Sequence, residues 1–241
     1  MTRLTSCPDA DTVAARAAAH VQRELAQARE RRGVAHLGLS GGGTPELTYR
    51  RLGEDPQALA QTEIWFADER CVPPQDEQSN YRLAAATLLE PAGIPQQLVH
   101  RMQGELGPAR GAAQYQAELL AGPTAAADGV PVLDLIVLGI GPDGHIASLF
   151  PGARTLDAGQ GALCLGVSDS PKPPPERITL SLAVLRAARG CLLLATGASK
   201  ADAVAAMLGE QTPHVPASLL RRERLTVILD DAAGSLQAAP R

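Results

Sequence analysis

The chain has 241 residues, a formal net charge of −4 and no basic run. Aromatic residues make up only 2% of it, which disfavours a stacking platform for single-stranded nucleic acid. Because the net charge is negative and there is no basic run, neither nucleic acid nor an anionic membrane is expected as the main partner. A content of 45% hydrophobic and 20% charged residues is typical of a soluble globular protein, and the length suits one domain covering residues 1–241.

The first predicted element is a helix over Asp9–Arg32. Apolar residues recur there at every fourth position, at Val13, Ala17, Val21 and Leu25. Asp9 can cap the start of this helix and Gly33 can end it. No secretory signal precedes it, and no apolar run reaches the about 20 residues that a membrane span needs. We therefore expect a cytoplasmic protein.

A glycine-rich loop follows the predicted strand Val34–Leu39. It contains Ser40, Gly41, Gly42, Gly43 and Thr44, and it leads through Pro45 into a predicted helix over Glu46–Leu52. Backbone N–H groups and the helix dipole favour an anion at such a turn, and the two hydroxyls add donors. The loop has neither the GK[ST] of a P-loop nor a GxGxxG pattern, which favours a single small phosphate over ATP or NAD. A turn without a ligand is the alternative.

Three charged residues end the next predicted strand, Glu63–Ala67. They are Asp68, Glu69 and Arg70, and they belong to the same edge of the predicted sheet as the glycine-rich loop. An arginine there can fork onto a phosphate or carboxylate, while Asp68 is a candidate substrate ligand. Capping or a surface ion pair is the alternative for the two acids. A helix is predicted next, over Tyr81–Leu89.

The remaining pattern repeats strand, loop and helix. It predicts a brief strand near Leu98–Met102, helices over Pro108–Leu120 and Ala201–Leu208, strands over Leu163–Val167, Cys191–Thr196 and Leu225–Leu229, and a frayed tail over Ala232–Arg241. This alternation predicts an α/β fold with a mostly parallel sheet and helices on both faces.

The most informative stretch is LIVLGIGPDGHIASLFP, residues 135–151. It begins as a strand buried on both faces and turns abruptly into a glycine-rich segment that holds Asp143 and His145. Open α/β sheets bind ligands where such strands end. An imidazole with a pKa near about 6.5 suits activation of water, and Asp143 can orient the ring. A structural histidine in a tight turn is the alternative. Ser148 lies in no GxSxG frame.

Only two lysines occur among the 22 basic residues, Lys172 and Lys200. A lysine at the start of a helix opposes the helix dipole unless an anion lies beside it, so Lys200 is predicted to face a bound phosphate. A solvent-facing lysine is the alternative. Arg177 is expected to join the same rim. The cysteines Cys7, Cys71, Cys164 and Cys191 form no CxxC pair, so no metal or redox site is predicted.

Six motifs in this order resemble the short, sugar-phosphate-isomerase-like 6-phosphogluconolactonases. They are LSGGGTP (39–45), WFADERCVP (65–73), SNY (79–81), LDLIVLGIGPDGHIASLFPG (133–152), PKPPPERITLSL (171–182) and TGASKADAV (196–204). The resemblance implies a three-layer, Rossmann-like fold. It also implies hydrolysis of 6-phospho-D-glucono-1,5-lactone in the oxidative pentose phosphate pathway, without metal or cofactor.

The resemblance also implies roles for individual residues. His145 would be the general base that activates water, positioned by Asp143, and it would then protonate the leaving ring oxygen. Arg70 would hold the substrate or stabilise charge on the lactone oxygen. The phosphate would lie on backbone and cationic groups of Gly42, Gly43, Thr44, Lys200 and Arg177.

Two other functions remain open at this point. A glucosamine-6-phosphate deaminase shares the GIG-x-DGH segment, but it continues with Asn-Glu-Pro where this chain has Leu149, Phe150 and Pro151, and phenylalanine transfers no proton. A non-catalytic sugar-phosphate sensor would need only the phosphate loop. The expected partner is a small sugar-phosphate lactone, with neither nucleic acid nor a membrane. A monomer is expected, with a weak dimer as the alternative.

Overall fold

The computed structural model describes residues 2–126, 128–159 and 161–236. Its main sheet has six parallel strands in the order β1-β9-β8-β5-β2-β3. Their bounds are β1 Arg3–Cys7, β2 Ala35–Leu39, β3 Thr62–Phe66, β5 Leu135–Gly139, β8 Gly190–Ala195 and β9 Leu225–Asp230. The predicted α/β class with a mostly parallel sheet is confirmed.

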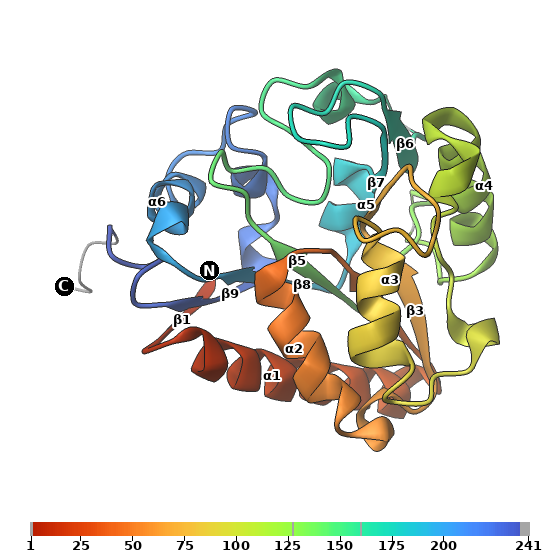
Figure 1. Cartoon of the computed structure of the whole chain (residues 1–241), viewed down its shortest axis with the longest axis horizontal. Helices are drawn as coiled ribbons and strands as arrows, with labels where there is room; N and C mark the ends of the chain where they lie inside the picture. Colours follow the sequence, from red (N-terminus) through yellow and green to blue (C-terminus); the bar gives the residue numbers. More distant parts are fainter. Residues whose placement is uncertain (1, 127, 160, 237–241) are drawn as a thin grey trace.

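Six α-helices surround the strands in the described part of the chain. Their bounds are α1 Ala10–Arg32, α2 Gly43–Gly53, α3 Asn80–Ala84, α4 Pro108–Ala121, α5 Leu182–Ala187 and α6 Ala201–Leu208. In Figure 1, α1 runs below the main sheet with α2 packed against it, while α5 and α6 lie above the sheet. Helices thus cover both faces, which gives the three-layer, Rossmann-like arrangement.

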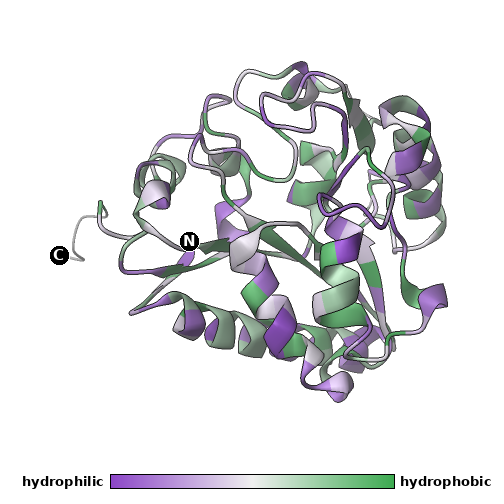
Figure 2. Ribbon diagram, in the orientation of Figure 1, coloured by the Kyte–Doolittle hydropathy of each residue, from purple (hydrophilic) through white to green (hydrophobic). Residues whose placement is uncertain are grey.

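Helix α1 shows how local sequence determines an element. The Asp9 carboxylate accepts the backbone N–H of Thr12 at its start, and Gly33 ends it in the left-handed region at φ 80°. The predicted stripe Val13, Ala17, Val21 and Leu25 is fully buried against the sheet. Figure 2 shows the same division, with hydrophobic strands inside and hydrophilic residues on the outer helix faces.

A second sheet has three antiparallel strands in the order β4-β7-β6. They are β4 Asp68–Arg70, β7 Arg177–Leu180 and β6 Cys164–Val167, and α4 packs against β6 and β7. The sequence pattern predicted β6 alone, because β4 consists of three charged residues and β7 contains no uninterrupted apolar run. This sheet places Asp68, Arg70 and Arg177 on regular backbone rather than on loops.

Other predicted boundaries need correction. Residues 98–102 form no strand, since only an isolated parallel bridge joins Val99 to Ile64. The predicted helix over 81–89 divides into α3 and a π-helical turn at Ala85–Leu89. Strand β1, on the edge of the main sheet, was not predicted. Of the predicted frayed tail, residues 237–241 lie outside the described residues, and Ala233 is buried.

Within the described ranges, no helix is both long and apolar enough to cross a membrane.

Candidate functional site

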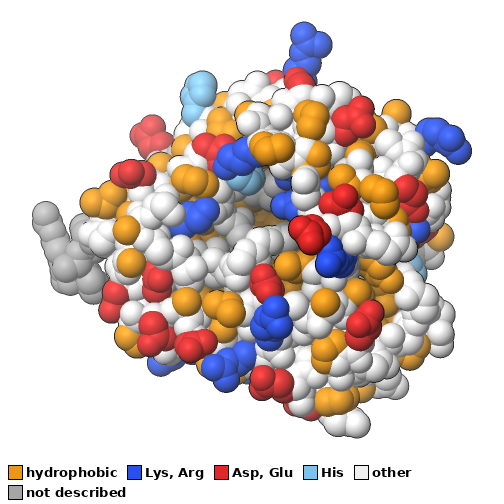
Figure 3. Space-filling view, viewed as in Figure 1, with side chains coloured by type: hydrophobic (Ala, Val, Ile, Leu, Met, Phe, Trp, Pro, Cys, Tyr) orange, Lys and Arg blue, Asp and Glu red, His pale blue; other side chains and the backbone are white. Residues whose placement is uncertain are grey.

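A cavity of about 410 Å³ opens where the parallel strands β2, β5 and β8 end. Figure 3 shows this hollow on the face toward the viewer, with lysine and arginine side chains around it. Ten of the eleven predicted site residues line it, namely Ser40, Gly41, Gly42, Gly43, Thr44, Asp68, Arg70, His145, Arg177 and Lys200. The eleventh, Asp143, is hydrogen-bonded to His145.

The glycine-rich loop presents the start of α2 to this cavity. Gly42 precedes the helix at φ 110°, a conformation that L side chains rarely adopt, and within the described residues no side chain caps the helix. The first N–H groups of α2 are therefore open to an anion. Thr44 Oγ1 lies 2.7 Å from Thr196 Oγ1, which joins this loop to the end of β8.

Ser40 occupies the base of the loop and is buried. Its hydroxyl accepts the backbone N–H of Gly139 at 3.3 Å, and its backbone N–H and C=O both bond to the buried Tyr49 hydroxyl. Ser40 thus connects β2 with β5, and the outer residues of the loop are the ones free to contact a ligand.

His145 lies in the turn that follows β5. Its Nδ1 is 2.5 Å from Asp143 Oδ1, a distance that places the Nδ1 proton between them and leaves Nε2 as the acceptor. Gly141 donates its N–H to the His145 carbonyl, and a Cβ at Gly141 would collide with the imidazole and with the Asp143 carboxylate. The absence of a side chain at Gly141 is therefore what allows this pair to form.

The surroundings of the pair favour a neutral imidazole. Burial lowers the pKa of His145, Asp143 partly opposes this effect, and the nearby Lys172 ammonium lowers the pKa further. Burial alone would raise the pKa of Asp143, but the hydrogen bonds and charges of His145 and Lys172 outweigh it and hold that pKa below its ordinary value. At neutral pH the turn therefore holds an unprotonated imidazole beside a carboxylate.

Phe150 packs against the imidazole. The two ring centroids are 4.7 Å apart at an interplanar angle of 39°. Phe150 also contacts Arg177, whose guanidinium carbon lies 5.7 Å from the Phe150 ring centroid. Phe150 is buried, so an apolar side chain covers part of the imidazole. An apolar neighbour of this kind disfavours the charged imidazolium.

Arg70 is the most available cation at the second sheet. Its NH1 donates to the Gln78 carbonyl at 2.5 Å, while its buried Nε has no partner within the described residues. The buried Glu69 carboxylate holds the adjoining backbone, accepting the N–H groups of Arg70, Asn80 and Tyr81. An arginine fixed in this way lines the cavity and brings a positive charge to it.

Asp68 and Arg177 line the cavity, but both already make several hydrogen bonds within the protein. The two Asp68 oxygens accept from Ser148 Oγ at 2.8 Å and from Asn80 Nδ2 at 3.1 Å. Arg177 is 5% exposed, and it donates to the carbonyls of residues 172, 173 and 174, each at 3.1 Å. Both residues therefore shape the cavity wall, whatever they contribute to ligand binding.

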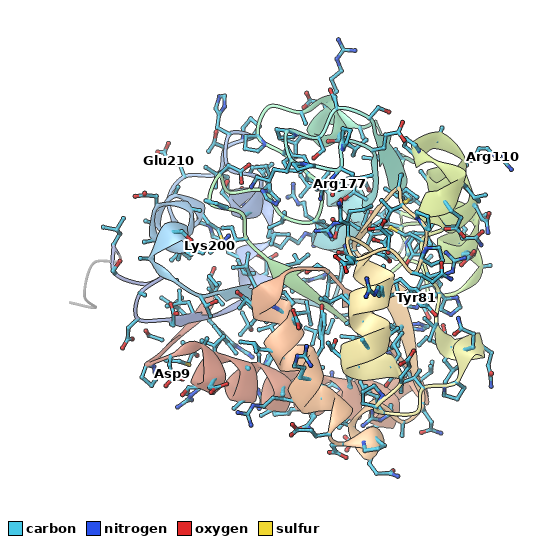
Figure 4. The ribbon with its side chains drawn as sticks, viewed as in Figure 1. Asp9, Tyr81, Arg110, Arg177, Lys200 and Glu210 are labelled. Atoms are coloured by element: carbon cyan, nitrogen blue, oxygen red, sulfur yellow. The ribbon has the colours of Figure 1, made fainter. Side chains whose placement is uncertain are left out.

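Two polar side chains that line the cavity were not among the predicted set, those of Lys172 and Thr196. Lys172 Nζ lies 3.2 Å from Asp143 Oδ1. The scarcity of lysine in the sequence could have pointed to Lys172, since both lysines of the chain line the same cavity. Lys200 lies just before α6, and burial, together with the Lys172 charge, lowers its pKa. Figure 4 shows Lys200 and Arg177 on opposite sides of the hollow.

A carboxylate-bound imidazole thus shares one cavity with two lysines, two arginines and a helix start. This arrangement can bind an anionic ligand and move a proton beside it. In the ranges 2–126, 128–159 and 161–236, no group of three or more His, Cys, Asp or Glu side chains is placed to hold a metal ion.

Comparison with known proteins gives matches along nearly the whole chain. Residues 8–229 match the family model described as glucosamine-6-phosphate isomerases/6-phosphogluconolactonase. The human 6-phosphogluconolactonase is 38% identical over 212 residues, covering 85% of this chain and 81% of its own, and that of Mycobacterium tuberculosis is 37% identical over 239 residues, covering 95% and 96%. The solved structure of 6-phosphogluconolactonase from Trypanosoma brucei aligns with a TM-score of 0.87 at 25% identity, covering 99% of each chain.

Proposed function

This chain belongs to the family of glucosamine-6-phosphate isomerases and 6-phosphogluconolactonases, and we propose that it hydrolyses 6-phospho-D-glucono-1,5-lactone with His145 as the general base. It is an enzyme of the lactone-hydrolase class, as its relatives at 37–38% identity over most of its length are. The observation that carries the proposed mechanism is the hydrogen bond between His145 and Asp143 in a cavity rich in cations.

In the first step, the His145 Nε2 lone pair takes a proton from water as the water oxygen attacks the lactone carbonyl carbon. The carbonyl oxygen becomes an oxyanion, and in this proposal the positive charge of Arg70, in the wall of the same cavity, stabilises it. In the second step, the bond between this carbon and the ring oxygen breaks, and the imidazolium returns its proton to that oxygen. The products are 6-phosphogluconate and the regenerated neutral imidazole.

The phosphate end of the substrate belongs at the helix start. The N–H groups of Gly42, Gly43 and Thr44 and the dipole of α2 favour a dianion there, and Lys200 adds a charge from the start of α6. Arg70 and Arg177 face the same cavity from the second sheet. In this placement the substrate extends from the glycine-rich loop toward His145.

The proposal needs neither a metal nor a cofactor, because the imidazole supplies the base and arginine and lysine supply positive charge. It also places the chain in the oxidative pentose phosphate pathway of the cytoplasm, a reducing compartment that suits the four free cysteines. We further propose a monomer as the active unit.

The deaminase alternative is disfavoured by the residue that packs on His145. Phe150, which lies within 4.7 Å of the imidazole centroid, cannot assist the opening of an amino sugar ring. The test is an assay of the purified chain on freshly made 6-phosphogluconolactone, with glucosamine 6-phosphate as the second substrate. We expect lactone hydrolysis well above the spontaneous rate and no release of ammonia. Release of ammonia without enhanced lactone hydrolysis would overturn the proposal.

A further inference from the structure

We propose that Lys172 is a positioning residue, which holds the Asp143 carboxylate in place and keeps His145 ready to accept and release a proton. This inference deepens the proposed function and rests on it. It concerns a side chain from the proline-rich segment 171–175, far from the glycine-rich turn in sequence.

The first observation is that Lys172 shares its acceptor with the imidazole. Lys172 Nζ lies 3.2 Å from Asp143 Oδ1, the same oxygen that is 2.5 Å from His145 Nδ1. Nζ is also 3.3 Å from Nδ1 itself. An ammonium group only donates, and the Nδ1 proton is directed to the carboxylate, so Lys172 donates to Asp143 and lies beside the imidazole as an unbonded positive charge.

The second observation is that the backbone of Lys172 is fixed on both sides. Its N–H donates to Ser170 Oγ at 3.2 Å, and its carbonyl accepts from Ser170 Oγ at 2.8 Å and from the Arg177 guanidinium at 3.1 Å. Ser170 and Arg177 are both buried. Arg177 also contacts Phe150, which packs on the imidazole, so one buried arginine supports both neighbours of His145.

These contacts balance the charges around the imidazole. The charged groups that act on His145 are Asp143 and Asp68, which favour the imidazolium, and Lys172, which opposes it, while burial by neighbours such as Phe150 also opposes it. Without Lys172, the Asp143 carboxylate would bind the imidazolium more strongly and retain its proton. With Lys172 in place, the imidazolium is a stronger acid and returns the proton more readily to the leaving ring oxygen.

The competing role for Lys172 is direct binding of the substrate phosphate, since its side chain also lines the cavity. The two roles predict different kinetic effects. A phosphate ligand acts through KM and matters only for phosphorylated substrates, whereas a positioning residue acts through kcat and the acid limb of the pH profile. The other lysine, Lys200, provides the matched control, because it lines the same cavity without acting on His145.

The experiment follows the titration of His145 by NMR in the free protein, with its imidazole signal assigned from an H145Q variant. The Lys172→Gln variant removes the charge, Lys172→Met removes it with a side chain of similar length, and Lys172→Arg retains it. We expect the titration midpoint of His145 to rise in the Gln and Met variants and to stay near the wild-type value in the Arg variant. Lys200→Gln is expected to leave the midpoint unchanged.

Kinetics complete the test. The Gln and Met variants are expected to lose more kcat at acidic than at alkaline pH, with a smaller change in KM. An unchanged midpoint in either folded charge-removing variant, or a rise in KM alone, would overturn the inference. The NMR readout needs no substrate, so a wild-type chain without lactonase activity would contradict the proposed function and leave the Lys172 result interpretable.

Discussion

Arg70 and Arg177 lie directly opposite one another across the antiparallel β4–β7 ladder. Like charges in opposite positions destabilise a sheet, and both of these side chains line the same cavity. The period of two along β4 also turns Asp68 toward the cavity and Glu69 away from it. A bound anion would offset the repulsion between the two arginines, which makes this pair a place where ligand binding and folding stability are linked.

The first prediction concerns this linkage. We expect 6-phosphogluconate to raise the Tm of the wild-type chain, since a ligand at 100 times its Kd stabilises the folded state by about 2.7 kcal/mol. Arg70→Ala should reduce that rise, because it removes a cation that lines the cavity. Arg110→Ala, on the exposed surface of α4, is the control and should behave as wild type. Equal rises in all three proteins would contradict the placement of Arg70.

The second prediction concerns Lys200 and the phosphate. Lys200→Ala should raise KM for 6-phosphogluconolactone by about tenfold or more, which corresponds to the loss of about 1.4 kcal/mol or more of binding. Hydrolysis of unphosphorylated gluconolactone should be little affected, because it has no phosphate to bind. Steady-state kinetics on both lactones make the comparison. An equal loss on both substrates would show that Lys200 does not act on the phosphate.

The third prediction concerns the space at Gly141. Gly141→Ala places a methyl group where the His145 ring and the Asp143 carboxylate now lie, so their hydrogen bond must break or shift. We expect kcat to fall by at least about tenfold, because the general base would no longer be held in position. At Gly159, by contrast, an added Cβ meets no atom of the described residues within 4 Å. Gly159→Ala should therefore retain full activity, and a Gly141→Ala variant as active as this control would refute the argument.

The fourth prediction is the direction of the pH dependence. Burial, strengthened by Lys172 and opposed by Asp143, lowers the pKa of His145 below its ordinary value of about 6.5. A base with a lowered pKa remains unprotonated to more acidic pH, so the midpoint of the acid-side fall in kcat/KM should lie below about pH 6.5. Initial rates corrected for spontaneous hydrolysis at each pH measure this. A midpoint above the ordinary histidine value would contradict the description of the site.

Much of the fold and of the site could be predicted because the signals are local. The strand Leu135–Gly139 is apolar throughout, and the glycines that follow it mark the turn that holds His145. The stripe on α1 and its two caps are equally local. Since carboxyl ends of parallel strands share one edge of a sheet, the loops after β2, β5 and β8 were correctly expected to meet.

The features that were missed depend on contacts between distant segments. Strand β7 was missed because apolar and polar residues alternate over only four positions, too few to indicate a strand. Its pairing with β4 also joins positions about a hundred residues apart in the sequence. Lys172 was noticed only as a rare residue type. Its approach to His145 follows from the bonds that Arg177 makes to the carbonyls of the proline-rich segment, and no periodicity reports such bonds.

The role of His145 as the general base is tested by comparing wild type with His145→Ala on freshly made 6-phosphogluconolactone. If His145 is the base, kcat corrected for spontaneous hydrolysis should fall by about 10²–10⁴-fold. Binding of 6-phosphogluconate should be largely retained, because the proposed phosphate contacts lie on the glycine-rich loop and Lys200. A His145→Ala variant that hydrolyses the lactone at the wild-type rate would show that His145 is not the base.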